Sequence, residues 1–478
     1  MEKQIKNEAI TSRETDFAQW YTDVCKKAEL MDYSSIKGFI IYRPYGYAIW
    51  EQIQKYLDQK FKDTGHENVY MPMVIPQSLF NKEKEHVEGF APETLIATLG
   101  GKEKLEDPLI IRPTSEVLFC EHYAKIINSY RDLPKKYNQW CSVVRWEKTT
   151  RPFLRGAEFL WQEGHTVHET EQEARFETLQ MLKIYQTLGE ELLAIPFLTG
   201  RKTEKEKFAG AKETYAVEAL MHDGKSLQSG TSHYFGTGFA EAFGIQFQNR
   251  QNQLQPVHQT SWGVSTRLIG SLIMVHGDDN GLILPPRVAP IQVIIVPIMP
   301  QKPGVLSQAK ALFELLKKSG IRVMLDETDN SPGWKYAEAE MKGIPLRIEL
   351  GPRDLEQQQV VMVKRNDKLK KTIKFSELVQ ESKVTLELIQ KELLQHAKQH
   401  LANNIREANS LDEMISILNQ FGGYVKVSVD DTEEVEKIVK EKAQATARVI
   451  PFDQIGLKRV CAITGKPAKR IVYFARAY

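Results

Sequence analysis

Residues 140–166 carry the side chains of this sequence that are best suited to holding a charged ligand. Valines and aromatic residues around Arg145 and Glu147 predict a strand, in which side chains two positions apart share a face. A second predicted strand starts near Arg155 and brings Glu163 and His165 to one side. Because buried charges must be paired or bound, such a face indicates either a ligand site or a well-solvated polar surface. The pattern alone leaves both interpretations open.

The two strands are predicted to form a hairpin with a mobile loop. Pro152 lies in the connecting segment KTTRPFL, which cannot be an interior strand because proline lacks the amide hydrogen of a sheet ladder. Along the second strand, Ala157, Phe159 and Trp161 continue the face that Arg155 begins. The elements of this stretch therefore position a surface that is both charged and aromatic.

Two further stretches place polar residues at helix starts. IIRPTSEVLF predicts a strand that runs into a helix, with Thr114 or Ser115 as the cap and Glu116 in the first turn. TSWGVSTRLIGSLIMVHGDD predicts an apolar helix that starts at Arg267, where free amides and an arginine would attract an anion. Many helices start this way, so the pattern is weak. The pair Asp278–Asp279 that follows is interpreted as a solvated turn rather than a metal site.

Together these stretches resemble the class II aminoacyl-tRNA synthetases. Arg145-x-Glu147, a loop and Arg155-xxx-Phe159-xxx-Glu163 are similar to motif 2 of that class, and TSWGVSTRLIG is similar to motif 3. RWE, TRPFLR, EFLWQEGHT, TSE and GTSH resemble the prolyl-tRNA synthetases of archaeal and eukaryotic type. The resemblance covers nearly the whole chain in order. It implies ATP-dependent activation of L-proline and transfer to the 3′ end of tRNA(Pro).

The resemblance implies a proline site with acidic side chains. Glu116 and Glu163 would lie near the proline amine, because a secondary ammonium group offers two N–H donors that need charged or carbonyl acceptors. The residues implied to contact proline are Thr114, Glu116, Arg145, Trp161, Glu163, His165, Phe208 and His233.

An ATP site follows from the same resemblance. Arg145 would bridge the proline carboxylate and the α-phosphate, and it is implied to be catalytic together with Arg267. Mg²⁺ would be held through the ATP phosphates, with Gln228 as a further ligand. The residues implied to contact ATP are Arg145, Glu147, Arg155, Gln228, Thr231, Ser265 and Arg267. The spacing of Gln228, Thr231 and His233 does not fit one strand face, so periodicity alone predicts no site there.

Two alternatives compete with this interpretation. A synthetase for threonine, glycine or histidine would share the architecture, although no Cys/His set suits the core zinc that the threonyl enzyme needs. A catalytically silent paralogue that binds tRNA or a protein would be expected to lose charged motif residues, which this chain keeps. About a hundred residues separate Glu163 from Gly263, and all fit core elements, so we expect no editing insertion.

Composition favours a cytoplasmic protein. The chain has 478 residues, 42% hydrophobic and 26% charged, with a net charge of +2, so any RNA contact must come from local patches. Four separated cysteines fit a reducing compartment. The N-terminal segment shows no signal peptide, and no apolar run reaches the length of a membrane span.

The order of predicted elements indicates three domains of mixed α/β and α+β class. Residues 1–286 would form an antiparallel-sheet catalytic core, 287–400 an anticodon-binding α/β domain, and 401–478 a small α+β domain. A proline-rich linker, LILPPRVAP, separates the first two. In the second domain, Arg347, Arg353, Lys364 and Arg365 fit either anticodon contacts or a solvated strand edge.

The last domain departs from its family pattern of four zinc-binding cysteines. The corresponding positions are Val427, Thr432, Cys461 and Thr464, so we expect apolar packing and no zinc. Family members with a similar ending fold the last tyrosine toward the active site, and Tyr478 fits either that role or a packed terminal strand.

A helix followed by a strand that stops at Pro72 resembles motif 1 of the class, which forms the homodimer interface in that family. Taken alone, the same segment fits an ordinary helix–strand unit. We expect a homodimer through this segment because of the other motifs.

Overall fold

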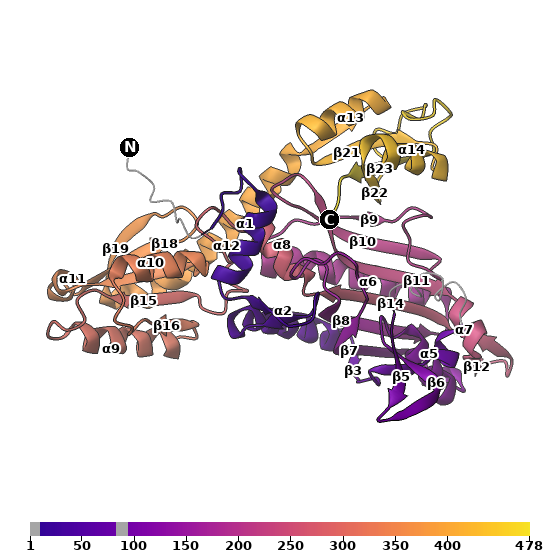
Figure 1. The fold of residues 1–478 in the computed structure, drawn as a ribbon, viewed down its shortest axis with the longest axis horizontal. Coiled ribbons are helices and arrows are strands. Elements are labelled where there is room, and N and C mark those ends of the chain that lie inside the picture. The colour runs from indigo at the N-terminus through magenta and orange to yellow at the C-terminus, as the bar shows by residue number, and fades with distance from the viewer. Residues whose placement is uncertain (1–9, 83–93) are drawn as a thin grey trace.

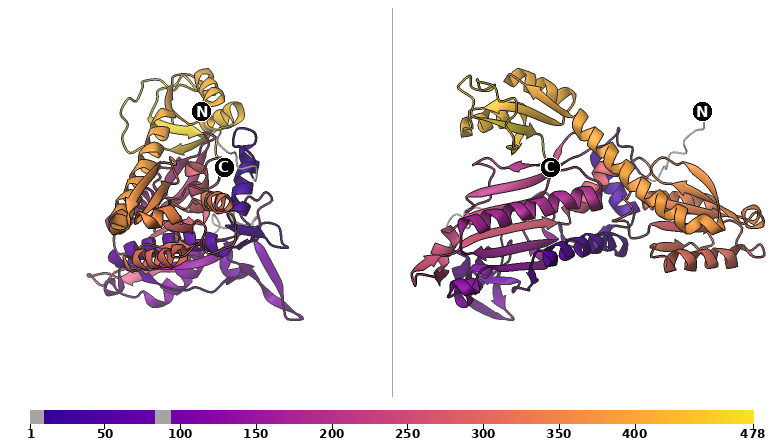
Figure 2. Two further views of the ribbon diagram at one scale, coloured as in Figure 1. Left: turned by 90° about the vertical axis from the view of Figure 1, so that its left-hand side faces the viewer. Right: turned by 180° about the vertical axis from the view of Figure 1, so that it is seen from behind.

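The structure, a computed structural model, describes residues 10–82 and 94–478. The first nine residues, on which part of the expectation of no signal peptide rests, lie outside the described residues. Figures 1 and 2 show a core region (10–284), a middle region (293–403) and a C-terminal region (405–478). In the part of the chain that the structure describes, no helix is both long and apolar enough to cross a membrane.

A seven-stranded sheet forms the centre of the core region. Its order is β3-β7-β8-β14-β11-β10-β9, and all neighbours are antiparallel except β3 and β7. The strands are β3 (Glu67–Asn68), β7 (Lys135–Val144), β8 (Glu158–His168), β9 (Leu198–Arg201), β10 (Glu213–Leu220), β11 (Ser226–Gly236) and β14 (His258–Ser265). This confirms the predicted antiparallel core and the hairpin of β7 and β8.

Helices pack against this sheet and form the main apolar core. α6 contacts four of its strands, and α8 contacts β11 and β14. The helices are α1 (Phe17–Lys27), α2 (Pro44–Asp63), α5 (Glu116–Ile126), α6 (Glu171–Leu188) and α8 (Arg267–His276), with short helices α3 (Gln77–Phe80) and α7 (Gly238–Phe243). A turn of π-helix, Gly189–Leu193, extends α6.

Helical spacing of Phe176, Leu179, Leu182 and Tyr185 predicts an apolar stripe that faces the core, but the buried face of α6 differs from it. Leu182 and Tyr185 are buried, but Phe176 is 66% exposed and Leu179 is 42% exposed. Glu177 is buried instead, where it accepts a hydrogen bond from His66 (2.7 Å). A paired carboxylate can therefore occupy a core position that an apolar pattern assigns elsewhere.

Small sheets surround the core. The three-stranded sheet β4-β6-β5 comprises β4 (Val74–Pro76), β5 (Leu95–Gly100) and β6 (Glu103–Ile111), and the ribbons are β1 (Met31–Tyr33) with β2 (Ile40–Tyr42) and β12 (Gln246–Gln248) with β13 (Leu254–Pro256). The expectation of a strand up to Pro72 is wrong, because β3 ends at Asn68 and the chain leaves the sheet before Pro72.

The middle region is a five-stranded sheet of order β16-β15-β17-β18-β19 with helices around it. β15 is parallel to β16 and β17, which confirms the predicted α/β class of this domain. The strands are β15 (Val293–Pro297), β16 (Val323–Leu325), β17 (Leu346–Leu350), β18 (Gln359–Lys364) and β19 (Lys370–Lys374), and the helices are α9 (Val305–Lys318), α10 (Pro332–Met341), α11 (Pro352–Glu356) and α12 (Leu378–Asn403).

Three of the four basic residues considered for anticodon contacts are buried ion-pair partners. Arg347 pairs with Glu349, Lys364 pairs with Glu392, and the guanidinium of Arg365 donates to both oxygens of Asp278 (2.9 and 2.7 Å). The turn expected at Asp278 is present, because Asp278 and Gly281 exchange backbone hydrogen bonds, but the Asp278 carboxylate is paired with Arg365 and the expectation that it is solvated is wrong. Arg365 ties the middle region to the core region through this carboxylate.

The C-terminal region is a four-stranded sheet, β20-β21-β23-β22, with two helices. Its elements are β20 (Ile405–Ala408), α13 (Leu411–Gln420), β21 (Tyr424–Val429), α14 (Glu433–Ala443), β22 (Thr446–Val449) and β23 (Arg470–Ala475). Figure 2 shows α12 running from the middle region to this one.

The positions aligned with zinc ligands lie close together in the C-terminal region. Val427 and Cys461 belong to its apolar core, and the hydroxyls of Thr432 and Thr464 both donate to Asp430 at 2.7 Å. Within residues 10–82 and 94–478, no group of three or more His, Cys, Asp or Glu side chains is arranged to hold a metal. The absence of zinc stays a prediction.

Buried histidines lie where the core region meets α12. His276 donates to the Leu193 carbonyl (2.9 Å), and the His222 ring lies 5.2 Å from that of His400 on α12. Burial lowers the pKa of His276 to about 4 and that of His222 to about 3.

These pKa values predict that the protein loses stability as the pH falls from about 6.5 to about 4. In that window the unfolded state binds protons that the folded state excludes. His276→Gln keeps a donor for Leu193 and should reduce the stability lost between pH 7.5 and pH 5 by about 2 kcal/mol. Denaturant unfolding at the two pH values measures this loss, and an unchanged difference would show that His276 does not contribute.

Candidate active site

A cavity of about 210 Å³ opens on one face of the large sheet, over β8, β11 and β14. It is lined by Thr114, Glu116, Arg145, Phe159, Trp161, Glu163, His165, Glu206, Phe208, Thr214, Gln228, Ser229, Gly230, Thr231, His233, Ser261, Trp262, Gly263, Val264, Ser265 and Arg267. All eight residues expected around the amino acid are in this lining. Of the seven expected around ATP, five are present and two are not.

Arg145 and Arg267 form the cationic part of the cavity. Arg145 donates through Nε to the Pro113 carbonyl (3.0 Å), and its guanidinium lies 5.4 Å from the ring centroids of both Phe159 and Trp161. Arg267 is anchored by the carbonyls of Leu154 and Gln228. Burial, with the charge of Arg145 nearby, lowers the pKa of Arg267 to about 10. An anion placed between the two guanidinium groups would relieve this repulsion.

Glu147 and Arg155 lie outside the cavity lining. The expectation that Arg145 and Glu147 stand side by side on a strand is wrong, because β7 ends at Val144 and the Glu147 amide donates to the Arg145 carbonyl (2.7 Å) in a tight turn. Arg155 precedes β8, approaches Glu147 at 3.7 Å and is half-exposed. Both belong to the loop of the hairpin.

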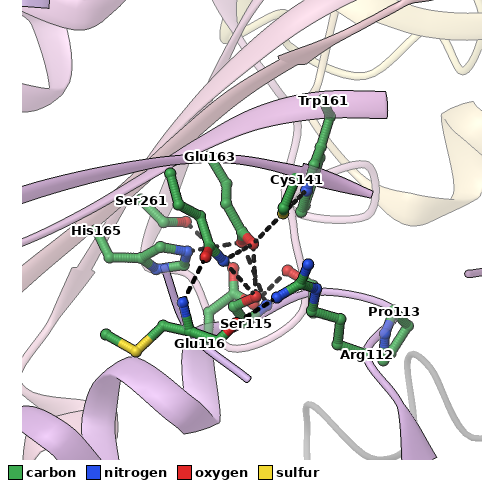
Figure 3. Close-up of polar contacts among 12 residues, drawn as sticks. Arg112, Pro113, Ser115, Glu116, Cys141, Trp161, Glu163, His165 and Ser261 are labelled. Atoms are coloured by element: carbon green, nitrogen blue, oxygen red, sulfur yellow. Dashed lines mark hydrogen bonds and ion pairs between the residues drawn. The ribbon is translucent and has the colours of Figure 1, made fainter. Parts of the chain in front are cut away.

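Glu163 is buried at the centre of a hydrogen-bond cluster, shown in Figure 3. Its carboxylate accepts from Ser115 Oγ (2.5 Å), Gln139 Nε2 (2.6 Å) and His165 Nε2 (2.8 Å). Burial alone would raise the pKa of Glu163, but these donors outweigh it and hold the pKa below its usual value. The carboxylate is therefore ionised and fully engaged by protein donors.

Glu116 has fewer protein donors than Glu163. It accepts from Thr114 Oγ1 (2.5 Å) and, more weakly, from Ser261 Oγ (3.4 Å). The expected side-chain cap at this helix start is not formed, because Ser115 donates to Glu163 instead. Glu116 is thus the buried carboxylate of the cavity with more capacity to accept hydrogen bonds from a ligand.

Aromatic rings close the same end of the cavity. The Phe208 ring lies 4.6 Å from that of His233, whose Nδ1 is 2.9 Å from Thr214 Oγ1. Burial, with His165 nearby, lowers the pKa of His233 to about 3, so this ring is neutral at physiological pH. A neutral, partly aromatic wall beside a carboxylate suits a small ligand with an apolar ring and a cationic amine.

A β-bulge explains why strand periodicity does not predict Gln228 and Thr231 on one face. Glu218 pairs with Gln228 and Val217 with Gly230, so Ser229 is an extra residue in β11. The bulge shifts the alternation by one position, and both Gln228 and Thr231 therefore line the cavity.

Several lining residues were missed. The alternation of β8 predicts Phe159 on the face of Trp161 but assigns it no role. Ser261 and Gly263 share the alternation of Ser265 along β14, and this alternation is a signal that points to them. No pattern in the sequence points to Glu206, because it lies in an irregular segment. Thr214 lies on β10, and no pattern in the sequence points to it either.

A second cavity, of about 680 Å³, lies between the hairpin loop and the C-terminal region. It is lined by Thr149, Thr150, Arg151, Leu154, Arg155, Glu206, Lys225, Gln444, Thr446, Arg448, Ala477 and Tyr478. The Tyr478 hydroxyl donates to Asp223 (2.5 Å), and its amide donates to the Ser226 carbonyl (3.1 Å). The chain end therefore folds back onto the core region beside the first cavity without lining it.

Comparison with known families agrees with this arrangement. Residues 99–276 match the family described as tRNA synthetase class II core domain (G, H, P, S and T), residues 292–385 match the anticodon binding domain, and residues 411–478 match Prolyl-tRNA synthetase, C-terminal. The fold and site are those of a class II aminoacyl-tRNA synthetase. With the relatives described next, these matches show that the chain belongs to the prolyl-tRNA synthetase family.

Curated relatives match over nearly their full length. The proline–tRNA ligase of Ruminiclostridium cellulolyticum is 59% identical over 471 residues, which are 98% of this chain and 98% of the relative. Those of Lachnoclostridium phytofermentans and Clostridium novyi are 58% and 57% identical with the same coverage.

Proposed function

We propose that the chain activates L-proline with ATP and transfers the prolyl group to tRNA(Pro). The observation that carries the proposal is one cavity with two chemically distinct ends. Arg145 and Arg267 supply the cationic end, and Glu116, beside aromatic rings, supplies the end for a ring-shaped amine. A silent paralogue would not need both ends.

In the proposed first step, an oxygen of the proline carboxylate attacks the α-phosphorus of ATP. The bond from that phosphorus to its bridging oxygen breaks, and pyrophosphate leaves. Arg145 brings the two anions together, and Arg267 offsets the charge that develops on the phosphate oxygens. A terminal hydroxyl of tRNA(Pro) then attacks the prolyl carbonyl, and AMP leaves.

The proline subsite is assigned by its polar groups. Glu116 accepts the N–H donors of the prolinium nitrogen, while Glu163 keeps His165 and Ser115 in place behind it. Trp161 and Phe208 enclose the ring. Thr114 and His233, hydrogen-bonded to Glu116 and Thr214, complete this subsite.

The ATP subsite is assigned to Arg145, Gln228, Thr231, Ser265 and Arg267. Glu147 and Arg155 are proposed to join it from the hairpin loop when nucleotide binds. The donor set suits an Mg²⁺ ion that arrives on the phosphates, because Gln228 offers an oxygen ligand and the arginines oppose a bare cation. Bound Mg²⁺ would neutralise phosphate charge.

We also propose a homodimer through the surface around Pro72. Tyr70 and Met73, on either side of Pro72 in the sequence, are 69% and 51% exposed, and exposed apolar side chains can mark an interaction surface. Analytical ultracentrifugation of the chain and of Tyr70→Glu tests this, since the charge should weaken association.

We propose domain limits of 1–286, 287–400 and 401–478 and no structural zinc. The four cysteines are free thiols, which supports a cytoplasmic location.

Aminoacylation tests the function as a whole. The purified chain should attach labelled proline to tRNA(Pro) in the presence of ATP and Mg²⁺, and it should leave a non-cognate tRNA uncharged. Stable binding of tRNA(Pro) without any charging would favour the silent paralogue.

Gln139→Met tests the support behind Glu163. Gln139 is buried, donates to Glu163 and accepts from the Met71 amide (2.9 Å), so its loss removes hydrogen bonds to a buried charge. We expect KM for proline to rise about tenfold while KM for ATP changes little. Gln259→Met, a buried glutamine on β14 outside the cavity, is the matched control. Equal effects of the two variants on proline binding would contradict this role.

A further inference from the structure

A buried cluster of charges lies where the C-terminal region meets the large sheet. The carboxylate of Glu218 on β10 is fully buried and accepts from Lys202 Nζ (2.8 Å) and from Arg448 Nη2 (2.8 and 3.0 Å) on β22. Lys202 and Arg448 are only 3% and 7% exposed. Because a buried carboxylate needs its partners, the three side chains form one unit.

Other hydrogen bonds hold the two regions together around this cluster. Ser226 Oγ donates to Glu218 (2.8 Å) and lies 2.8 Å from the Tyr424 hydroxyl. The backbones of Arg201 and Ile450 exchange hydrogen bonds of 2.9 and 2.7 Å. The C-terminal region is thus joined to β9, β10 and the start of β11.

Glu218 stands at the β-bulge that shapes the nucleotide end of the first cavity. It pairs across the ladder with Gln228, and the next pair, Val217 with Gly230, skips Ser229. The Gln228 carbonyl in turn accepts from Arg267 Nη1 (3.2 Å). When Glu218 is held in place by its partners, the segment of β11 around Gln228 is held in place as well. This segment places Gln228 at the cavity and supplies the carbonyl that Arg267 binds.

We propose that Arg448 is a positioning residue for ATP binding, contributed to the catalytic site by the C-terminal region. It acts through Glu218 and the bulge, and it touches neither substrate in the proposed arrangement. The C-terminal region is then part of the nucleotide site and more than an appended domain. The inference rests on the proposed function for its choice of ligand.

Arg448→Met tests this inference. Methionine keeps much of the apolar stem, and Glu218 keeps Lys202 and Ser226, so the core remains charge-paired. We expect the Kd of the full chain for ATP with Mg²⁺, measured by titration calorimetry, to rise about tenfold. The Kd for proline should stay within about twofold, because Glu116 on α5 and Trp161 on β8 lie outside the bulged strand pair. Arg470→Met, which removes a C-terminal arginine paired with Asp431 (2.7 Å), should change neither constant.

If Arg448→Met acted only by destabilising the fold, the change would not be confined to the Kd for ATP. If both Kd values rise together, or if the variant only unfolds at a lower temperature with ATP affinity unchanged, the positioning role is wrong. Should Arg448→Met not fold, Arg448→Lys provides the same comparison with a smaller expected rise for ATP. ATP binding is measured without amino acid or tRNA, so it does not depend on proline activation. If the chain failed to activate proline, the proposed function would be rejected, but the ATP Kd of Arg448→Met would still decide the role of Arg448.

Discussion

Arg145→Ala is expected to reduce proline-dependent ATP–pyrophosphate exchange by about 100-fold or more. The guanidinium is held over Phe159 and Trp161, where it can meet both the carboxylate nucleophile and the α-phosphate. Its loss removes charge stabilisation that is greatest in the transition state. The decrease should therefore appear mainly in kcat, which initial-rate exchange at saturating proline and ATP measures.

The matched control is Arg131→Ala, which removes an exposed arginine of the same domain. It should exchange at the rate of the unsubstituted chain. Near-normal exchange by Arg145→Ala would show that Arg145 is not the bridging residue.

Glu116→Gln is expected to raise KM for proline by about 10- to 100-fold, the range for a lost hydrogen bond to a charged group. Glutamine keeps the shape of the side chain and can still pair with Thr114, but it cannot offer a full negative charge to the prolinium nitrogen. KM for ATP should be nearly unchanged, because Arg145, Arg267 and the bulge are untouched.

Glu121→Gln is the matched control for this substitution. Glu121 lies on the same helix, α5, and pairs with Lys125 at the surface. An equal rise in KM for proline and for ATP in Glu116→Gln would indicate a disturbed fold rather than a lost amine contact.

The sequence predicted the site better than it predicted local geometry. Arg145, Glu163 and Arg267, which the resemblance to the family singles out, lie far apart in the sequence and line one cavity. Single-strand periodicity failed at Gln228 and Thr231, since a bulge adds one residue that no simple alternation contains.

Two other wrong predictions from the sequence, at Asp278 and on α6, have one physical cause, which is ion pairing between residues that are far apart in the sequence. The sequence predicts a solvated turn at Asp278, yet the Asp278 carboxylate is paired with Arg365 of the middle region. Helical periodicity predicts Phe176 on the buried side of α6, yet its side chain is exposed and Glu177, paired with His66, is buried instead. Partners separated by tens of residues leave no local pattern in the sequence.

The most direct test of the account is amino-acid-dependent ATP–pyrophosphate exchange by the unsubstituted chain. Proline should support strong exchange, alanine and cysteine weak exchange, since a small apolar pocket discriminates only about 10- to 200-fold per methylene. Threonine, glycine and histidine should support none. Exchange with one of these three in place of proline, or no exchange with any amino acid in a folded protein that binds tRNA, would contradict the assignment.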